Sequence, residues 1–263
     1  MDHIVIFVVS RVFFILLLLV NPVLLSASQL PQPLFEKAIQ ASRNGEFVEA
    51  LEQWDQFLEL VPDDALAWSN RGNVRFALGD FEGAIADQTK SIELLPFELD
   101  SHLNRGIAEE ALELWKEATT DYKWVLERDP EEVSALFNLG NLKVAEGNWS
   151  EAEAFFQKAS LAQSGFVMAR SSKALMLYQL GDLDEAESEL RTIIRRYPMF
   201  ADARAALSAL LWNKGFFGEA ESHWAAVAGL DSRYREEDWL LNVRRWPPKP
   251  TNDLFAFLTL ESP

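Results

Sequence analysis

One small residue recurs through most of the chain at a fixed interval. Six alanines follow one another at steps of 34 residues, with no insertion or deletion between them. They are Ala50, Ala84, Ala118, Ala152, Ala186 and Ala220. A strict period of this length is typical of repeat proteins, in which each supersecondary unit contacts only its neighbours. The chain is therefore predicted to form an elongated array, not one globular core.

Other residues recur in the same register and indicate the structure of one unit. A glycine stands five residues before each alanine, except at Glu113. The glycines are Gly45, Gly79, Gly147, Gly181 and Gly215. Glycine adopts the left-handed conformation at little cost and so ends a first helix, while proline twelve residues after four of the alanines ends a second helix. Each unit is predicted to be an antiparallel helix pair, with the alanine small enough for a neighbouring helix to cross it.

The clearest unit identifies a family resemblance. It reads Trp68-Ser69-Asn70-Arg71-Gly72, followed by Gly79, Phe81, Ala84 and Pro96. This pattern resembles the tetratricopeptide repeat, although Gln88 and Ser91 stand where that family has apolar residues. The resemblance extends over 31–234 and implies an all-α, right-handed superhelical solenoid of six helix pairs with a concave inner wall. The repeats are predicted at 31–64, 65–98, 99–132, 133–166, 167–200 and 201–234.

Residues 1–28 precede the repeats and have a different character. Arg11 is followed by nine apolar residues, then by Asn21-Pro22 and small residues up to Ser28. Nine apolar residues are too few to span a bilayer, which takes about 20. The order of base, short apolar run, helix breaker and small residues is typical of a secretory signal peptide. The alternative is a membrane anchor, which would hold Arg11 within the bilayer.

Residues 235–263 are predicted to close the array with a capping helix and a Pro-rich, apolar tail. Acidic residues from Glu236 stand at the start of the predicted helix and basic residues up to Arg245 at its end, which is the arrangement that the helix dipole favours. Pro247-Pro248 would end this helix. Apolar residues at helical spacing would cover the last repeat: Trp239, Leu240, Val243 and Trp246. The apolar segment Leu254–Leu258 must then pack back or bind something. The residues from Asp231 to Pro248 also resemble the tail of tetratricopeptide proteins from cyanobacteria and chloroplasts, which implies a photosynthetic setting.

Charge and composition exclude several classes of function. The 263 residues contain 41 Asp and Glu against 24 Lys and Arg, a net charge of −17, and no cysteine. A thiolate metal site, a disulfide and a cysteine nucleophile are therefore impossible. Nucleic acid is not expected as a partner, because phosphate binding needs a clustered positive field.

No set of residues at catalytic spacing appears in the chain. His102 takes the packing position that Trp68 has in its repeat, and His223 has no His or Asp at ligand spacing. Nucleophile elbows, phosphate-binding glycine loops and HExxH motifs are absent from the sequence. The chain is predicted to be no enzyme and to need neither a metal nor a cofactor.

The resemblance implies a protein-binding groove on the concave side of the first helices. Positions six and nine of these helices hold amides: Asn70, Asn73, Asn104, Asn138 and Asn141. Position twelve adds an apolar stripe that includes Phe76, Tyr178 and Trp212. An amide offers both a donor and an acceptor and can pair with the backbone of an extended peptide. The alternative is that these residues are merely typical of the fold.

These observations predict a non-catalytic scaffold for protein–protein interaction, with a role in assembling a photosynthetic membrane complex. The acidic repeats favour a partner with an extended basic or neutral segment. The leader predicts export, to a thylakoid lumen or periplasm, or else anchoring with membrane contact through the N-terminal segment. The alternatives are an envelope glycan- or polymer-binding or enzymatic accessory protein, and a structural protein that self-associates through Leu254–Leu258.

Overall fold

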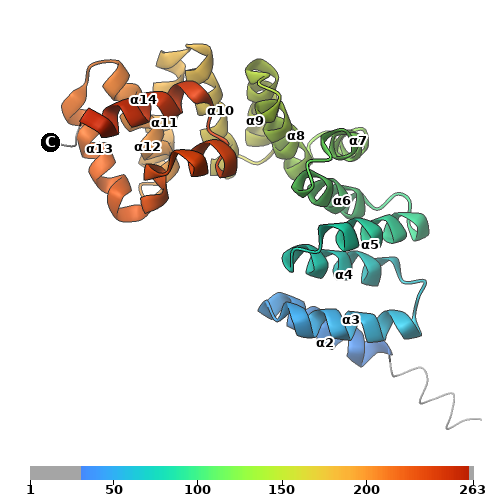
Figure 1. The fold of residues 1–263 in the computed structure, drawn as a ribbon. Helices are drawn as coiled ribbons and strands as arrows, with labels where there is room; N and C mark the ends of the chain where they lie inside the picture. The colour runs from blue at the N-terminus through green and yellow to red at the C-terminus, as the bar shows by residue number, and fades with distance from the viewer. Residues whose placement is uncertain (1–30, 261–263) are drawn as a thin grey trace, which may run out of the picture. The chain divides into compact units, whose positions relative to one another are not determined.

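The structure, a computed structural model, describes residues 31–260, and every regular element in that range is helical (Figure 1). The predicted signal peptide or anchor at 1–28 lies outside the described residues. The chain forms two compact units, with the boundary between Leu114 and Trp115. No helix between residues 31 and 260 combines the length and hydropathy that a membrane span requires.

The first unit contains the first two helix pairs and one further helix. The elements are α2 (Pro31–Asn44), α3 (Phe47–Leu60), α4 (Ala65–Ala77), α5 (Phe81–Leu94) and α6 (Leu99–Ala111). Its apolar core is centred on Trp54 and Phe57 of α3, with Ala38, Ala67 and Val74 packed around them. Aspartates stabilise two helix starts, because Asp64 accepts from Ala67 N and Asp80 accepts from Gly83 N.

The second unit continues the same order of helices. Its elements are α7 (Trp115–Leu126), α8 (Val133–Ala145), α9 (Trp149–Ala162), α10 (Val167–Leu180), α11 (Leu183–Arg196), α12 (Ala201–Asn213), α13 (Phe217–Leu230), the 3₁₀ turn η1 (Ser232–Arg235), the π-helical turn η2 (Trp239–Val243) and α14 (Pro248–Leu260). Its core is richest around α10 and α12. Nine residues of α12 are buried, so this helix lies at the centre of the unit.

The repeat register predicted from small residues is confirmed. All six phased alanines lie on second helices and are 1% exposed or less. The five phased glycines have positive φ angles, and Glu113, which replaces glycine in the same register, also has a positive φ of 60°. An L-residue pays a steric penalty in this conformation, so Glu113 holds the turn at a cost that glycine would avoid.

The C-terminal segment contains a short helix where the capping helix was predicted, and a further helix after it. The short helix covers 237–243, with η2 as its last part, and it ends before Pro247. The helix α14 then begins at Pro248, where the sequence predicted only a tail. Proline is favoured at a first helical position, since its missing N–H has no intrahelical acceptor to lose.

A buried carboxylate fixes the segment between the last repeat and α14. Asp202 of α12, 2% exposed, accepts hydrogen bonds from Tyr234 Oη (3.0 Å), Trp246 Nε1 (2.9 Å) and Ser171 Oγ (2.5 Å). Arg244 donates to both of its oxygens, from Nε at 2.8 Å and Nη2 at 2.6 Å. Burial raises the pKa of Asp202, but Arg244 and these hydrogen bonds outweigh it and hold the pKa below the ordinary value. We refer to Asp202 and these four partners as the Asp202 clasp.

Candidate functional site

A hollow opens between the first helices of the first two repeats. Its volume is about 330 Å³, and its lining residues are Ile39, Ser42 and Arg43 of α2, Phe47 of α3, and Asn70, Asn73 and Val74 of α4. Two of the predicted groove residues, Asn70 and Asn73, thus share one site with apolar side chains. We refer to this site as the α2–α4 hollow.

The fold sets the orientation of both amides in the hollow. Asn70 Nδ2 donates to the carbonyl of Leu66 at 2.8 Å. Gln88 Nε2 donates to the carbonyl of Ser69 at 3.0 Å and to Asn73 Oδ1 at 2.9 Å. Because carbonyl oxygens only accept, these contacts fix which end of each amide is the nitrogen. Asn70 Oδ1 is left as an acceptor and Asn73 Nδ2 as a donor.

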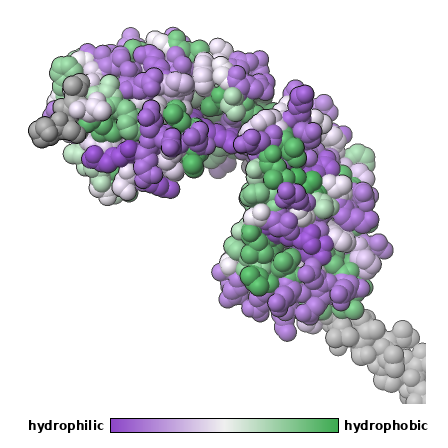
Figure 2. Space-filling view, viewed as in Figure 1, coloured by the Kyte–Doolittle hydropathy of each residue, from purple (hydrophilic) through white to green (hydrophobic). Residues whose placement is uncertain are grey.

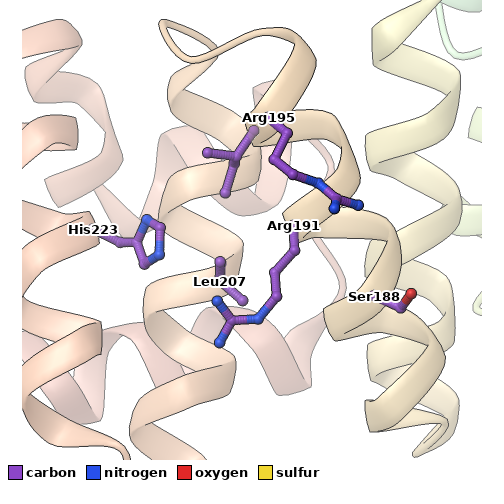
Figure 3. Close-up of a pocket in the computed structure, with 6 residues that line it drawn as sticks. Ser188, Arg191, Arg195, Leu207 and His223 are labelled. Atoms are coloured by element: carbon purple, nitrogen blue, oxygen red, sulfur yellow. The ribbon is translucent and has the colours of Figure 1, made fainter.

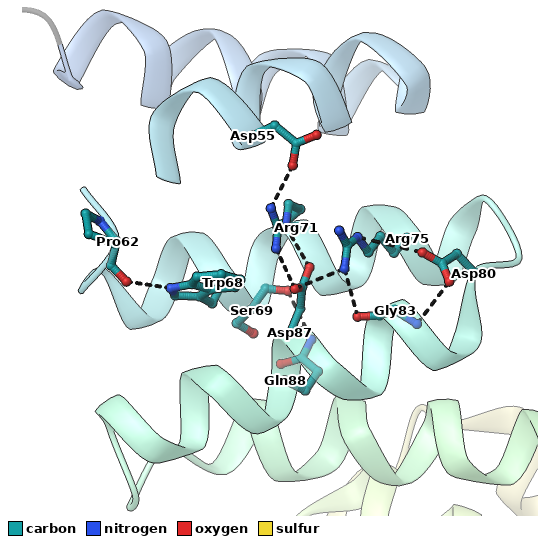
Figure 4. A network of polar contacts seen from close by, with 10 residues as sticks. All are labelled: Asp55, Pro62, Trp68, Ser69, Arg71, Arg75, Asp80, Gly83, Asp87 and Gln88. Atoms are coloured by element: carbon teal, nitrogen blue, oxygen red, sulfur yellow. Dashed lines mark hydrogen bonds and ion pairs between the residues drawn. The ribbon is translucent and has the colours of Figure 1, made fainter. Parts of the chain in front are cut away.

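A charged network lies in α4 and α5 next to the hollow (Figure 4). Arg71 donates to both oxygens of Asp87, from Nε at 2.8 Å and from Nη2 at 2.7 Å. It also donates from Nη1 to Asp55 of α3 at 2.7 Å, and Arg75 Nη1 reaches Asp87 at 3.2 Å. Burial opposes the charge of Arg71, yet its bonds to Asp87 and Asp55 raise its pKa above the ordinary value. The network joins the second helix of repeat 1 to both helices of repeat 2.

Sequence reasoning missed this network, although a signal for it was present. Arg71 and Arg75 stand where the tetratricopeptide pattern has leucine and tyrosine. Arg105 and Asp121 repeat the Arg71 and Asp87 positions 34 residues later in the sequence. Two opposite charges at core positions of one helix pair predict a buried ion pair, because an unpaired charge there would be costly.

The remaining predicted amides do not line the α2–α4 hollow. Asn104 lies on α6, and Asn138 and Asn141 lie on α8. All three side chains are partly exposed. They stay predicted contact residues, without a defined hollow around them.

The predicted apolar stripe has different surroundings along the chain. Phe76 is partly exposed and packs on Phe81, with ring centroids 5.2 Å apart. Tyr178 is fully buried, and Trp212 packs on Phe217 and on Phe257 of α14 at 4.5 and 5.1 Å. In this structure Tyr178 and Trp212 contact the chain's own C-terminal helix α14, and both stay predicted groove residues.

The apolar tail predicted to pack back or bind a partner does pack back. Leu254 and Phe257 are fully buried, and α14 lies on α12 and α10. Self-association through Leu254–Leu258 would require these two side chains to leave that position.

A second hollow lies on helices α11 to α13 (Figure 3). Arg191, Arg195 and Ile194 of α11, Leu207 of α12 and His223 of α13 line it. Arg191 already donates to Glu187 and Glu219, at 2.8 and 2.5 Å. His223 Nδ1 faces Arg204 Nη1 at 3.3 Å, and burial together with Arg204 lowers the His223 pKa. Both effects favour the neutral imidazole, and Arg191 is already paired with acids within the chain.

Within residues 31–260, no group of three His, Asp or Glu side chains has an arrangement that would hold a metal ion.

Comparisons with known proteins give a consistent picture. The family profile described as Tetratricopeptide repeat matches residues 35–98, 103–165 and 172–234, well over half of the chain. A tetratricopeptide repeat protein from Parabacteroides merdae aligns with a TM-score of 0.66 and 20% identity, over 88% of this chain and 93% of that one. No curated protein sequence matches the chain.

Two smaller solved structures share the fold over a shorter range. YrrB, described as a TPR protein with an unusual peptide-binding site, aligns with a TM-score of 0.56 and 22% identity, over 68% of this chain and 92% of that one. MamA from Desulfovibrio magneticus RS-1 aligns with a TM-score of 0.57 and 17% identity, over 63% of this chain and 93% of its own. At these identities the likeness is one of fold.

Proposed function

Since the chain belongs to the tetratricopeptide repeat family, we propose that it is a non-catalytic scaffold that binds a partner protein, and that the α2–α4 hollow holds an extended segment of that partner. The observation that carries the proposal is the pair of oriented amides, Asn70 and Asn73. YrrB is described as having a peptide-binding site, which is consistent with this use of the fold.

The two amides match the polar groups of a peptide backbone. Asn70 Oδ1 accepts a hydrogen bond and Asn73 Nδ2 donates one, as the N–H and C=O of an extended segment require. Their positions are held by Leu66 and Gln88 before a ligand arrives, so little side-chain entropy is lost on binding. Ile39 and Phe47 supply apolar surface for a side chain of the segment.

Charge favours a basic or neutral segment. Residues 31–114 contain 17 Asp and Glu against six Lys and Arg. Hydrophilic residues cover much of the face in view in Figure 2, with hydrophobic patches between them. A field of this sign accelerates association with a positive partner and repels an acidic one, and salt screens both effects. Arg43 is the cation within the hollow itself.

The setting of the scaffold is a further proposal. The leader at 1–28 supports export to a thylakoid lumen or periplasm, with cleavage or anchoring as the alternatives. The tail resemblance supports a role in assembling a photosynthetic membrane complex. Intact-mass measurement of the protein from its native source distinguishes a cleaved from a retained leader.

A display library of random twelve-residue peptides, selected on the full chain, tests the binding proposal. We expect selected peptides to be basic or neutral and to lose at least tenfold in affinity for the Asn70→Ala, Asn73→Ala double variant. Gln88→Leu should weaken binding as well, because it frees Asn73 without changing a residue that lines the hollow. Asn252→Ala, at an exposed amide on α14, is the matched control.

Two results would contradict the proposal. One is a set of selected peptides whose affinities the double variant leaves unchanged. The other is a preference for acidic peptides that persists at low salt.

A further inference from the structure

Helix α14 covers part of the predicted groove in the last two repeats. It packs on α12 and α10, the first helices of repeats 6 and 5, and crosses them in Figure 1. Leu254 and Phe257 are its fully buried apolar side chains. They contact the position-twelve stripe, since Phe257 packs on Trp212 at 5.1 Å. We refer to the surface that α14 covers as the α10–α12 face.

The contacts of α14 with this face are polar at one end and apolar at the other. Asp253 accepts from Tyr178 Oη at 2.8 Å and from Asn213 Nδ2 at 3.1 Å. The backbone N–H of Lys249 donates to Gln179 Oε1 at 2.8 Å. An acid followed by apolar residues one and four positions later is the pattern of an amphipathic helix that binds in a groove.

Separate sets of contacts hold α14 and the segment before it. The Asp202 clasp fixes the chain only as far as Trp246. Between the clasp and α14, Arg245 has a positive φ of 58°, which is unfavourable for a non-glycine residue. Helix α12 buries nine of its 13 residues, whereas the buried side chains of α14 are those of Pro250, Thr251, Leu254 and Phe257. None of the hydrogen bonds that define the Asp202 clasp reaches α14, so the departure of α14 would not break the clasp.

The face is also incompletely matched by its own helix. Trp224, 4% exposed, packs on Phe257 with ring centroids 6.1 Å apart. Its Nε1 is buried and finds no acceptor among the described residues. A buried donor without an acceptor is unfavourable, so a ligand that brings one would be favoured over α14 at this point.

We propose that the α10–α12 face is a second protein-binding site, for a partner helix that carries an acid followed by apolar residues one and four positions later. In this proposal α14 is the internal occupant that the partner helix displaces. The proposal does not depend on the α2–α4 hollow, and either site can fail without the other.

The test uses the full chain and a labelled synthetic peptide of residues 247–260 as the probe. The Leu254→Asp, Phe257→Asp double variant should vacate the face and bind the peptide at least tenfold more tightly than the wild type does, by fluorescence anisotropy. Asn252→Ala, an exposed substitution in the same helix, should behave as the wild type. A peptide carrying Phe257→Asp should not bind.

Two outcomes of this experiment would overturn the proposal. In the first, the double variant would keep its helical circular dichroism but bind no peptide. In the second, the double variant would lose the helices of its second unit, which would make α14 an inseparable part of the core. Limited chymotrypsin digestion of the wild type gives a second measurement. We expect cuts after Phe255 or Phe257 before any cut within α10 or α12; cuts in α10 and α12 at the same rate would also overturn the proposal.

Discussion

Replacing Asp202 by alanine should be the most damaging single change in the second unit. The substitution removes the carboxylate to which Arg244 donates at 2.6 and 2.8 Å. It also takes away the acceptor of Tyr234 Oη and of Trp246 Nε1. The side chain of Arg244 is 11% exposed, so water cannot replace the lost partner without opening the structure.

The size of the loss can be worked from these contacts. Breaking a buried ion pair by removing one partner costs about 3–5 kcal/mol. Each buried donor left without an acceptor adds about 1–3 kcal/mol, but these terms overlap because they share one carboxylate. We expect the free energy of unfolding to fall by about 4–5 kcal/mol, a large part of the roughly 5–15 kcal/mol typical of a domain. Arg244→Met in the Asp202→Ala background should recover part of the loss, because it removes the stranded charge.

Urea unfolding followed by tryptophan fluorescence and circular dichroism measures the effect. Asp184→Ala is the control, because Asp184 also pairs with a base, Lys214 at 2.8 Å, but is almost fully exposed. That variant should unfold at the wild-type midpoint, since exposed ion pairs contribute little. A loss below about 1 kcal/mol for Asp202→Ala would refute the view that the clasp holds the C-terminal segment.

Three further predictions follow from the backbone and from the pKa of Asp202. Glu113→Gly should raise the thermal midpoint, because it removes a steric penalty of about 1–2 kcal/mol for the left-handed conformation. The greater entropy of glycine in the unfolded chain offsets roughly 0.5–1 kcal/mol of this gain. A lower midpoint would contradict the repeat register. Gly140→Ala should destabilise the folded protein, because the added Cβ would lie 2.5 Å from Phe156 Cε1. The Cβ of Gly218→Ala would meet nothing within 4 Å, so this variant should stabilise the fold by about 0.5–1 kcal/mol. Urea midpoints that move in the same direction would contradict this packing. Because the folded-state pKa of Asp202 is lowered, its contribution to stability is present above the unfolded pKa near 4 and is lost as the pH falls through the folded value. Asp202→Asn should therefore reduce the fall in the free energy of unfolding at acid pH. An unchanged fall would contradict the lowered pKa of Asp202.

The repeat fold was predictable because its constraints are local and periodic. The 34-residue register predicted that a neighbouring helix crosses the small side chain of Ala118, and Ala118 is fully buried. In the structure Glu113 holds the left-handed turn that glycine holds in the same register of the other repeats. The position of α14 was not predictable in the same way. Pro248 is compatible with the end of one helix or the start of another, and the choice depends on the distant side chains of Tyr178 and Trp212 that α14 covers.

The sequence predicted the two amides of the candidate site, but not which atom of each amide is free to bind a ligand. The register placed Asn70 and Asn73 on one helix face, and the structure brings them to one hollow. Which atom of each amide is left for a ligand depends on Gln88, 15 residues beyond Asn73, and on the carbonyl of Leu66. Gln88 stood out in the sequence as a polar residue at an apolar position, and its role became clear only from its two hydrogen bonds.

Hydrogen–deuterium exchange of the full chain, with and without a saturating amount of a selected basic peptide, tests the central claim most directly. We expect new protection in α2 and α4, at Pro31–Asn44 and Ala65–Ala77, and none in α11 and α13. Protection that appears on α11 and α13 while α2 and α4 exchange as before would contradict the assignment of the α2–α4 hollow as the binding site.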